Sequence, residues 1–156
     1  MEHVGVQFRS YRAEDLAAMY ALDVVCFEAP FRFTRGAMRR FAAGKRARVI
    51  VAEERDVLVG FVIMNVEESK HGSVGYVVTL DVDPAFRGRG IARSLMEQAE
   101  AQARGADCAA MMLHVFTGND AALKFYARLG FVRAHREEGF YGAGMDAWFC
   151  HKVIVR

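Results

Sequence analysis

Residues 82–92 of the chain read Val82-Asp83-Pro84-Ala85-Phe86-Arg87-Gly88-Arg89-Gly90-Ile91-Ala92. They follow an apolar run, 75–80, and open an amphipathic one, 91–103, which predicts a loop between a strand and a helix. Backbone N–H groups at a helix start lack an intrahelical partner, and the helix dipole adds positive charge there. Gly88 and Gly90 let the backbone approach an anion closely, and nearby arginines add charge. Such a loop is either a phosphate site or simply a tight turn.

The spacing of this loop excludes two common phosphate-binding motifs. No Gly-Lys-Ser/Thr follows it, as a nucleotide P-loop requires, and the Gly-x-Gly-x-x-Gly spacing of dinucleotide-binding folds is missing. The pattern that is present is Arg87-x-x-Gly90-x-Ala92. It resembles the acyl-CoA pyrophosphate loop of the GCN5-related N-acetyltransferases (the GNAT family), whose motif is Gln/Arg-x-x-Gly-x-Gly/Ala.

A second motif strengthens this resemblance. It is the run Asn119-Asp120-Ala121-Ala122-Leu123-Lys124-Phe125-Tyr126-Ala127-Arg128-Leu129-Gly130-Phe131, about thirty residues further along. In the family, an Asn and an apolar helix that ends in Tyr-x-x-x-Gly-Phe follow the strand beside the cofactor. The resemblance covers most of the chain, from Phe8 to Val153, and is closest to the N-terminal protein acetyltransferases of the ribosomal-protein-alanine type.

The resemblance implies an α/β fold with a mixed, mostly antiparallel sheet of roughly six to seven strands and about four helices. A length of 156 residues suits a single domain over 1–156. In that fold the parallel strands that contain 79–82 and 112–115 splay apart, and the acyl chain enters the gap. The apolar patterns agree with it: strands are expected at 4–9, 49–53, 57–66, 74–82, 109–115 (buried), 131–136 and 147–155, and helices at 13–27, 34–43, 91–103 and from Asn119 to Gly130.

Composition narrows the class of protein. With 53% hydrophobic residues the chain can bury a full core, and its net charge of +2 does not favour nucleic-acid binding. We expect neither a secretory signal nor a membrane span, because the start lacks the pattern of a signal and no apolar run approaches about 18 residues. Three cysteines in apolar runs predict buried free thiols and a reducing, cytoplasmic location: Cys26, Cys108 and Cys150.

Basic residues concentrate in one part of the sequence. This cluster is either a solvated helix face or a surface that attracts acidic partners or CoA phosphates. Its members are Arg32, Arg35, Arg39, Arg40, Lys45, Arg46 and Arg48.

Acetyl transfer from a thioester to an amine needs a base, donors for the oxyanion and an acid for the thiolate. The resemblance makes Tyr126 the candidate acid, since a phenol with a pKa of about 10 holds a proton; a packed core tyrosine is the alternative.

His114 is the candidate base, because it interrupts an apolar run where an unpartnered histidine is costly. Tyr76, in a Tyr-x-x-Thr-Leu strand like that of one eukaryotic branch, would pair with His114 through water; a structural histidine is the alternative.

The chain departs from the bacterial ribosomal-protein-alanine enzymes, which have Glu where His114 stands. It keeps their Phe-x-x-Pro-Phe loop at 27–31, and their Tyr-Tyr pair becomes Phe140-Tyr141. The resemblance therefore leaves the range of substrates in doubt more than the reaction itself. The acceptor pocket would be walled by Tyr76 and by Phe27, Pro30, Phe31 and Tyr141, although core packing is an alternative for Phe27 and Phe31.

The resemblance also implies the cofactor site. Backbone amides of Leu80 and Val82 would hold pantetheine and polarise the thioester, and Asn119 could reach the pantetheine amides. The expected ligand is acetyl-CoA, without a metal. The whole cofactor-binding set is Leu80, Asp81, Val82, Arg87, Gly88, Arg89, Gly90, Ile91, Ala92, Asn119 and Phe125.

We therefore expect an acetyl-CoA-dependent N-acetyltransferase that works by direct attack, since no cysteine lies in the phosphate loop or at 113–119. The favoured acceptor is the N-terminal α-amine of a protein or peptide. One alternative is a small-molecule amine acetyltransferase of the same fold; another is a non-catalytic acyl-CoA sensor, which would need neither His114 nor Tyr126. An acidic pocket would favour polycationic small acceptors, and the candidate acidic residues are Glu28, Glu137, Glu138 and Asp146. The oligomeric state stays open.

Overall fold

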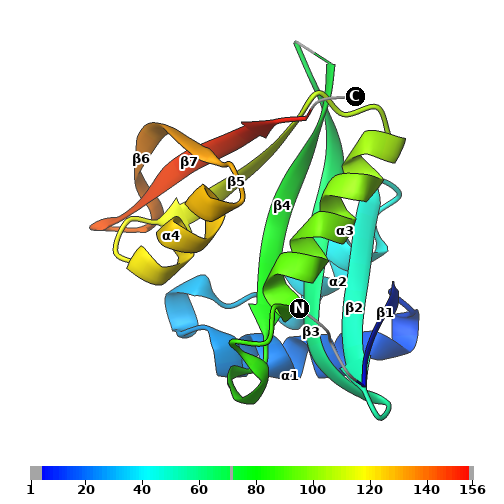
Figure 1. Cartoon of the computed structure of the whole chain (residues 1–156). Coiled ribbons are helices and arrows are strands. Elements are labelled where there is room, and N and C mark those ends of the chain that lie inside the picture. Colours follow the sequence, from blue (N-terminus) through cyan, green and yellow to red (C-terminus); the bar gives the residue numbers. More distant parts are fainter. Residues whose placement is uncertain (1–4, 71, 155–156) are drawn as a thin grey trace.

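The computed structural model describes residues 5–70 and 72–154. The described residues form a sheet in the order β1-β2-β3-β4-β5-β7-β6 (Figure 1). Only β4 and β5 pair in parallel among these neighbours. The strands are β1 (Val6–Ser10), β2 (Ala47–Glu54), β3 (Val57–Ser69), β4 (Gly72–Val82), β5 (Ala110–Phe116), β6 (Val132–Gly142) and β7 (Met145–Val153). The predicted mixed, mostly antiparallel sheet is confirmed.

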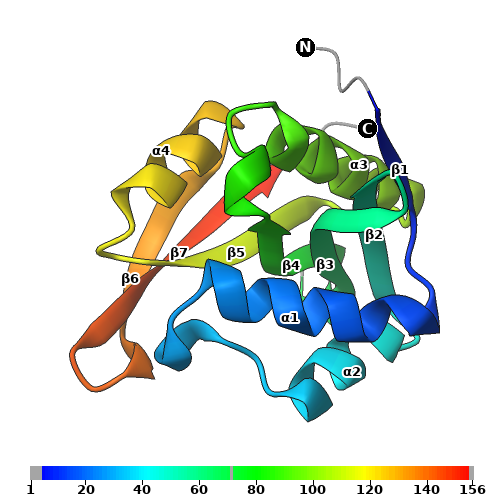
Figure 2. The same cartoon turned by 90° about the horizontal axis from the view of Figure 1, so that it is seen from below.

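Four α-helices cover the two faces of this sheet in the described part of the chain. They are α1 (Leu16–Cys26), α2 (Arg35–Ala43), α3 (Ile91–Gly105) and α4 (Asp120–Arg128). Figure 2 shows α1 and α2 on one face and α3 and α4 on the other. Each face has its own core, because side chains alternate along strands: Phe61 and Ile63 pack toward α1 and α2, whereas Val62 and Met64 pack toward α3.

The parallel pair separates soon after it begins. The strands β4 and β5 pair only from Val74 to Tyr76, opposite 110–112, and then diverge (Figure 1). A register shift on the other edge of β4 puts Met64 opposite Val77 and Ile63 opposite Thr79, so the strand bulges in between. Bulges bend a strand and increase its twist, which helps β4 to leave β5. The predicted splayed pair is therefore confirmed, and its gap lies between the two helix layers.

A glycine allows α3 to pack closely on β4. A Cβ on Gly75 would lie 2.7 Å from the sulfur of Met64 and 3.3 Å from the Cβ of Ala103. Any side chain at this position would therefore push the helix or Met64 away. The helix that follows the predicted phosphate loop is thus held directly over the start of the gap.

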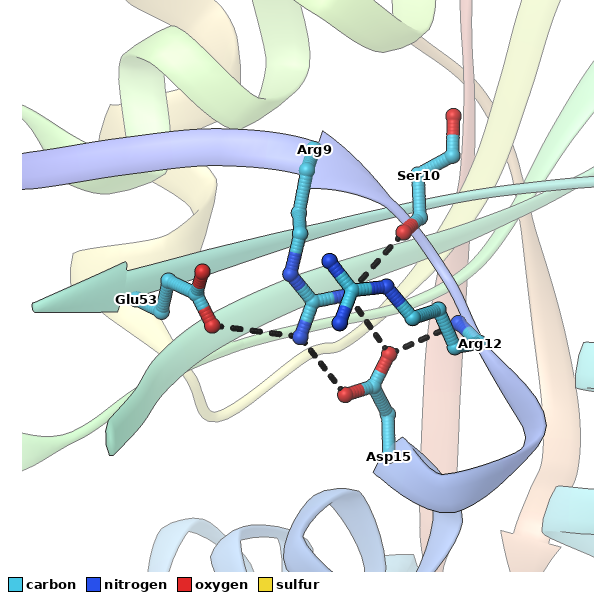
Figure 3. Close-up of polar contacts among 5 residues, drawn as sticks. All are labelled: Arg9, Ser10, Arg12, Asp15 and Glu53. Carbon is cyan, nitrogen blue, oxygen red and sulfur yellow. Dashed lines mark hydrogen bonds and ion pairs between the residues drawn. The ribbon is translucent and has the colours of Figure 1, made fainter. Parts of the chain in front are cut away.

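The first predicted helix begins later than expected. Instead of a helix over 13–27, a 3₁₀ turn (Ala13–Asp15) precedes α1, and Phe27 is extended. Asp15 is buried, and its carboxylate binds Arg9 at 2.8 and 2.9 Å and accepts the N–H of Arg12 (Figure 3). Arg9 also binds Glu53 of β2 at 3.1 Å. Through Arg9, the Asp15 carboxylate connects β1 and β2 to the turn before α1, and it does not cap the helix with its side chain.

Two further expectations about strands need correction, and a third falls outside the described residues. The strand β5 is not fully buried, because its inward residues alternate with half-buried ones that include His114. The strand β6 runs to Gly142, beyond the expected end at 136, because it pairs through two register shifts with β7. Phe140 and Tyr141 therefore stand on a strand. The predicted strand ends at residues 4 and 155 lie outside the described residues.

All three cysteines are free thiols, as predicted; Cys108 and Cys150 are buried, and Cys26 is half-buried. No helix in residues 5–70 or 72–154 has both the length and the apolar character that crossing a bilayer requires.

Candidate active site

A cavity of about 890 Å³ occupies the gap between β4 and β5 and opens toward both helix layers. It lies where the predicted site residues converge from the loop after α1, from β4, from the start of α3, from β5 and from α4. The predicted residues that line it are Phe27, Phe31, Leu80, Val82, Arg87, Gly88, Gly90, Ile91, Ala92, His114, Asn119, Phe125, Tyr126 and Tyr141. Those that do not line it are Pro30, Tyr76, Asp81 and Arg89.

The predicted phosphate loop ends at one side of this cavity. Gly88 and Gly90 have φ angles of +80° and +78°, a left-handed conformation that glycine adopts without strain. Gly90 directly precedes α3, so the first N–H groups of the helix have no intrahelical acceptor. Arg87 lines the cavity and donates its Nε–H to the carbonyl of Val82 at 3.2 Å. This end of the cavity is therefore positive and rich in N–H donors.

Arg89 is placed differently from the other loop residues. Its guanidinium pairs with Glu54 at 3.2 Å and lies over the ring of Phe86 at 4.9 Å. Arg93 of α3, outside the predicted cofactor set, lines the cavity instead. The periodicity of α3 could have indicated this, because Arg93 stands in its first turn.

The strand β4 presents alternate residues to two sides. Leu80 and Val82 line the cavity, whereas Asp81 points to the α1 side, is 1% exposed and accepts the hydroxyl of Thr79 at 2.6 Å. The Asp81 carboxyl group also interacts with the carboxyl group of Asp23 on α1. Burial, together with Asp23, holds the pKa of Asp81 well above its usual value, so Asp81 keeps a proton to donate.

Asp23 connects this strand to the loop that forms one wall of the cavity. It is completely buried, and its Oδ2 accepts the backbone N–H of Phe33 at 2.9 Å. Phe33 lines the cavity. Sequence reasoning missed this carboxyl pair; the available signal was an acidic residue in the otherwise apolar helix α1.

Tyr76 and His114 come together on the α1 side of the gap. The Tyr76 hydroxyl lies 2.6 Å from Nδ1 of His114. Burial raises the pKa of Tyr76 well above its usual value, so the hydroxyl keeps its proton. The His114 ring stacks on Phe140, with ring centroids 4.0 Å apart and planes 10° from parallel. Although Tyr76 is outside the cavity wall, it is thus linked to the cavity through His114.

Tyr126 lies on α4, on the opposite side of the gap from this pair, and lines the cavity. Its ring packs edge-on against Phe125 and Phe131. Burial raises the pKa of Tyr126 well above its usual value, so its hydroxyl is protonated at neutral pH. Asn119 caps α4 by accepting the N–H of Ala122 at 3.1 Å, which leaves its amide NH₂ group for a ligand.

Aromatic side chains form the wall on the acceptor side. The ring of Phe31 lies 5.1 Å from Phe116 and 5.0 Å from Tyr141, and burial raises the pKa of Tyr141 to about 12. Pro30 stands in the 3₁₀ turn Ala29–Phe31 and holds this wall from outside. Phe116 was not predicted, although its place two residues after His114 puts it on the same face of β5.

Cys26 is a further cavity residue that the sequence did not indicate. Its thiol donates to the carbonyl of Val82 at 3.3 Å, and burial raises its pKa to about 11. Since the thiolate is the nucleophilic form, this cysteine is poorly suited to attack a thioester. The expectation of direct attack by the amine is consistent with this environment.

Few acidic groups face the cavity. Glu28 is the one carboxylate among the lining residues in the described structure, and Glu137, Glu138 and Asp146 lie elsewhere. The basic cluster of residues 32–48 does not contribute to the described lining either; Arg46, for example, pairs with Glu68 on the surface at 3.1 Å. Within residues 5–70 and 72–154, no group of three or more His, Cys, Asp or Glu side chains could hold a metal.

A comparison with protein families agrees with this geometry. The model described as "Acetyltransferase (GNAT) family" matches residues 16–131, which is most of the chain. The chain therefore belongs to the acetyltransferase (GNAT) family, and the resemblance carried by the two motifs is confirmed.

Similar proteins are known from several organisms. N-alpha-acetyltransferase MAK3 of Arabidopsis thaliana is 36% identical over 90 residues, which are 58% of this chain and 47% of that protein. N-alpha-acetyltransferase RimI of Mycobacterium tuberculosis is 42% identical over 73 residues, 46% of this chain and 44% of that protein. The matched part spans about half the length of these curated relatives. The crystal structure of Arabidopsis thaliana NAA60 in complex with acetyl-CoA has a TM-score of 0.85 and 25% identity, over 96% of this chain and 98% of that chain.

Proposed function

We propose that this acetyltransferase transfers the acetyl group of acetyl-CoA to the α-amine at the N terminus of a protein or peptide. One observation carries the proposal: Tyr76 and His114 form a 2.6 Å contact on the acceptor side of the gap, opposite the Tyr126 side. A proton acceptor and a proton donor thus lie on the two sides of one cavity. The names of two relatives, the N-alpha-acetyltransferases MAK3 and RimI, support the same acceptor.

The cavity residues fit acetyl-CoA. The exposed N–H groups at the start of α3, with Arg87 and Arg93, suit its phosphates. Beyond Tyr76 the edge of β4 that faces β5 pairs with no strand among the described residues, so its backbone groups can bond pantetheine amides. Leu80, Val82 and Phe125 supply apolar lining on the way to the centre of the gap. Two predicted cofactor residues, Asp81 and Arg89, lie outside the cavity lining, and in the proposal they contribute to the site only indirectly.

The residues of the chain then divide the work of amide formation. Acetyl-CoA supplies the acetyl group as an activated thioester. His114, through Tyr76, accepts the proton that the incoming amine must lose before it attacks. Backbone N–H groups of β4 at Leu80 and Val82 stabilise the oxyanion. Tyr126 holds a proton at neutral pH and gives it to the departing sulfur.

Three features favour a peptide α-amine over other amines. An α-amine has a pKa of about 8 and lysine one of about 10.4, so an imidazole base deprotonates the former more readily near neutrality. The lining has a single carboxylate, Glu28, which gives a polycationic small molecule little to bind. The aromatic wall of Phe27, Phe31 and Tyr141 suits the first side chains of a peptide.

The experiment that tests this proposal compares two peptides of the same sequence. One has a free N terminus, and its twin is blocked at the N terminus and keeps a lysine. With acetyl-CoA and detection of the released thiol, we expect turnover of the free peptide and little of the twin. Equal rates would contradict the α-amine assignment, and turnover of small polyamines alone would favour the small-molecule alternative.

The same proposal extends to organisation and location. The described elements share one sheet, which supports a single domain over 1–156. Three free thiols support action in a reducing compartment such as the cytoplasm.

A further inference from the structure

The His114 ring has a second polar neighbour besides Tyr76. Its Nε2 lies 3.0 Å from Oε2 of Glu137, and Oε1 of the same carboxylate lies 3.1 Å from Nε2 of His135. Glu137 and His135 stand on β6, and β7 separates that strand from β5. The ring of Phe149 on β7 fills the space between the two histidines, 5.1 Å from His114 and 5.0 Å from His135. Sequence reasoning considered Glu137 only as a possible acidic group of the acceptor pocket.

These contacts assign the proton on the His114 ring. In the neutral ring one nitrogen carries the proton and the other accepts, and the 2.6 Å contact of Nδ1 with the Tyr76 hydroxyl suits either role. A bare Nε2 would face the carboxylate as a second acceptor and be repelled, and therefore Nε2 carries the proton. The Nε2–H is not well aligned with Oε2, so the attraction in this arrangement is mainly that of charge.

We propose that Glu137 is a positioning residue for the proposed acetyl transfer: it holds His114 in the tautomer with the proton on Nε2 and stabilises the ring when it becomes charged. The inference rests on the proposed function for the direction of proton movement. Nδ1 is then always available toward Tyr76. His135 and Phe149 keep the carboxylate and the ring in place.

The proton balance of this step is simple. The α-ammonium group of the acceptor gives one proton to the Tyr76 oxygen, directly or through a water, while Tyr76 gives its own proton to Nδ1 of His114. One positive charge thus moves from the amine to the imidazole ring. The Glu137 carboxylate, whose pKa is lowered first of all by its close contact with His114, faces this charge and offsets it.

Solvent limits the size of the effect. The side chain of Glu137 is 36% exposed, whereas that of His114 is 11% exposed. The interaction is therefore weaker than in a buried catalytic triad. Other charged or titratable groups also surround the pair. Tyr141 and Glu67 of β3 act on Tyr76, and His135 contacts Glu137. His151 lies on the same face of β7 as Phe149.

The test exploits two neighbouring glutamates. Glu137→Gln keeps an acceptor oxygen but removes the charge, and Glu138→Gln makes the same change on an exposed neighbour. We expect Glu137→Gln to lower kcat about tenfold, less than the roughly 10²–10⁴-fold that a general base contributes. The acidic limb of its pH–rate profile should move to lower pH by up to about 0.7 unit, with KM values for peptide and acetyl-CoA nearly unchanged. Glu138→Gln should match the wild type.

A spectroscopic readout separates this inference from the proposed function. Long-range ¹H–¹⁵N spectra of the unliganded protein show which nitrogen of His114 carries the proton, whatever the protein acetylates. We expect the Nε2–H form in the wild type and a mixture of tautomers in Glu137→Ala. An Nδ1–H form in the wild type, or an unchanged kcat and pH limb in Glu137→Gln, would overturn the positioning role. If the protein does not acetylate peptides, but His114 is in the Nε2–H form and Glu137→Ala disturbs that form, only the proposed function would be contradicted.

Discussion

Two tyrosines at the residue scale show how position assigns different tasks to one side chain. Burial raises the pKa of both Tyr76 and Tyr126, so both hydroxyls are protonated at neutral pH. Tyr76 contacts His114 at 2.6 Å, which makes it part of the base in the proposed mechanism. Tyr126 lines the cavity from α4, where a protonated hydroxyl can serve as an acid.

Replacing Tyr126 with Phe removes only this proton and keeps the ring. We expect single-turnover acetylation to slow by about 10²–10⁴-fold, the usual contribution of a general acid, with acetyl-CoA affinity nearly unchanged. Rapid-quench measurements of acetylated peptide check this, because they are not masked by product release. Tyr20→Phe, on α1 outside the cavity lining, is the matched control. A Tyr126→Phe enzyme as fast as that control would show that Tyr126 only packs.

At the scale of elements, the loop before α3 combines three separate features. The positive φ of Gly90 ends the loop, the open N–H groups of α3 follow directly, and Arg87 and Arg93 line the same end of the cavity. Each feature alone is common, and their combination supports the proposed phosphate site.

Gly90→Asp tests this element. A side chain at a φ of +78° costs about 1–2 kcal/mol, and the new carboxylate repels phosphate at the helix start. We expect acetyl-CoA affinity to fall at least tenfold in calorimetry, while circular dichroism stays native. Gly88→Asp is the control, because Gly88 also has a positive φ but does not cap α3. It therefore separates the effect of backbone strain from that of a charge at the helix start. Undiminished affinity in Gly90→Asp would contradict the phosphate site.

At the scale of the whole molecule, two buried carboxyl groups respond to pH in opposite ways. Arg9 lowers the pKa of Asp15, so the stability from this ion pair is present above the unfolded pKa and lost as pH falls. Burial and Asp23 raise the pKa of Asp81. Its contribution is therefore fully present below the unfolded pKa of about 3.9 and declines as pH rises toward the raised value. Stability should be greatest at mildly acidic pH.

Asp81→Asn isolates the alkaline side of this behaviour. The Asn amide can donate to Asp23 without binding a proton from solution. In the wild type, Asp81 holds one proton in the folded state that it does not hold in the unfolded state. The free energy of unfolding therefore falls by about 1.4 kcal/mol for each pH unit above about pH 4, until the pH passes the raised pKa. Thermal melts from pH 5 to 8 should show this slope in the wild type and in the exposed control Asp56→Asn, and lose it in Asp81→Asn. Equal slopes in all three would show that Asp81 is not the group that holds the proton.

Much of the fold could be predicted because local signals agreed with one another. Apolar periodicity indicated the strands and helices, Thr34 and Asn119 cap helices as expected, and Gly90 precedes α3. The errors lie where tertiary contacts override local preference. Asp15 is drawn from a helix start into an ion pair with Arg9, and β6 is extended by its pairing with β7.

The sequence by itself determined the family and the order of elements, and it singled out the proposed cofactor loop and the proposed catalytic residues Tyr76, His114 and Tyr126, because these depend on residue type and spacing along the chain. Only the tertiary structure decided which groups meet across strands. It turned Arg89 toward Glu54, enclosed Asp81 with Asp23, and brought Glu137 from β6 to His114 on β5. Such contacts depend on register, bulges and the pleat of neighbouring strands, and a one-residue shift in pairing would send each side chain to the other face of the sheet.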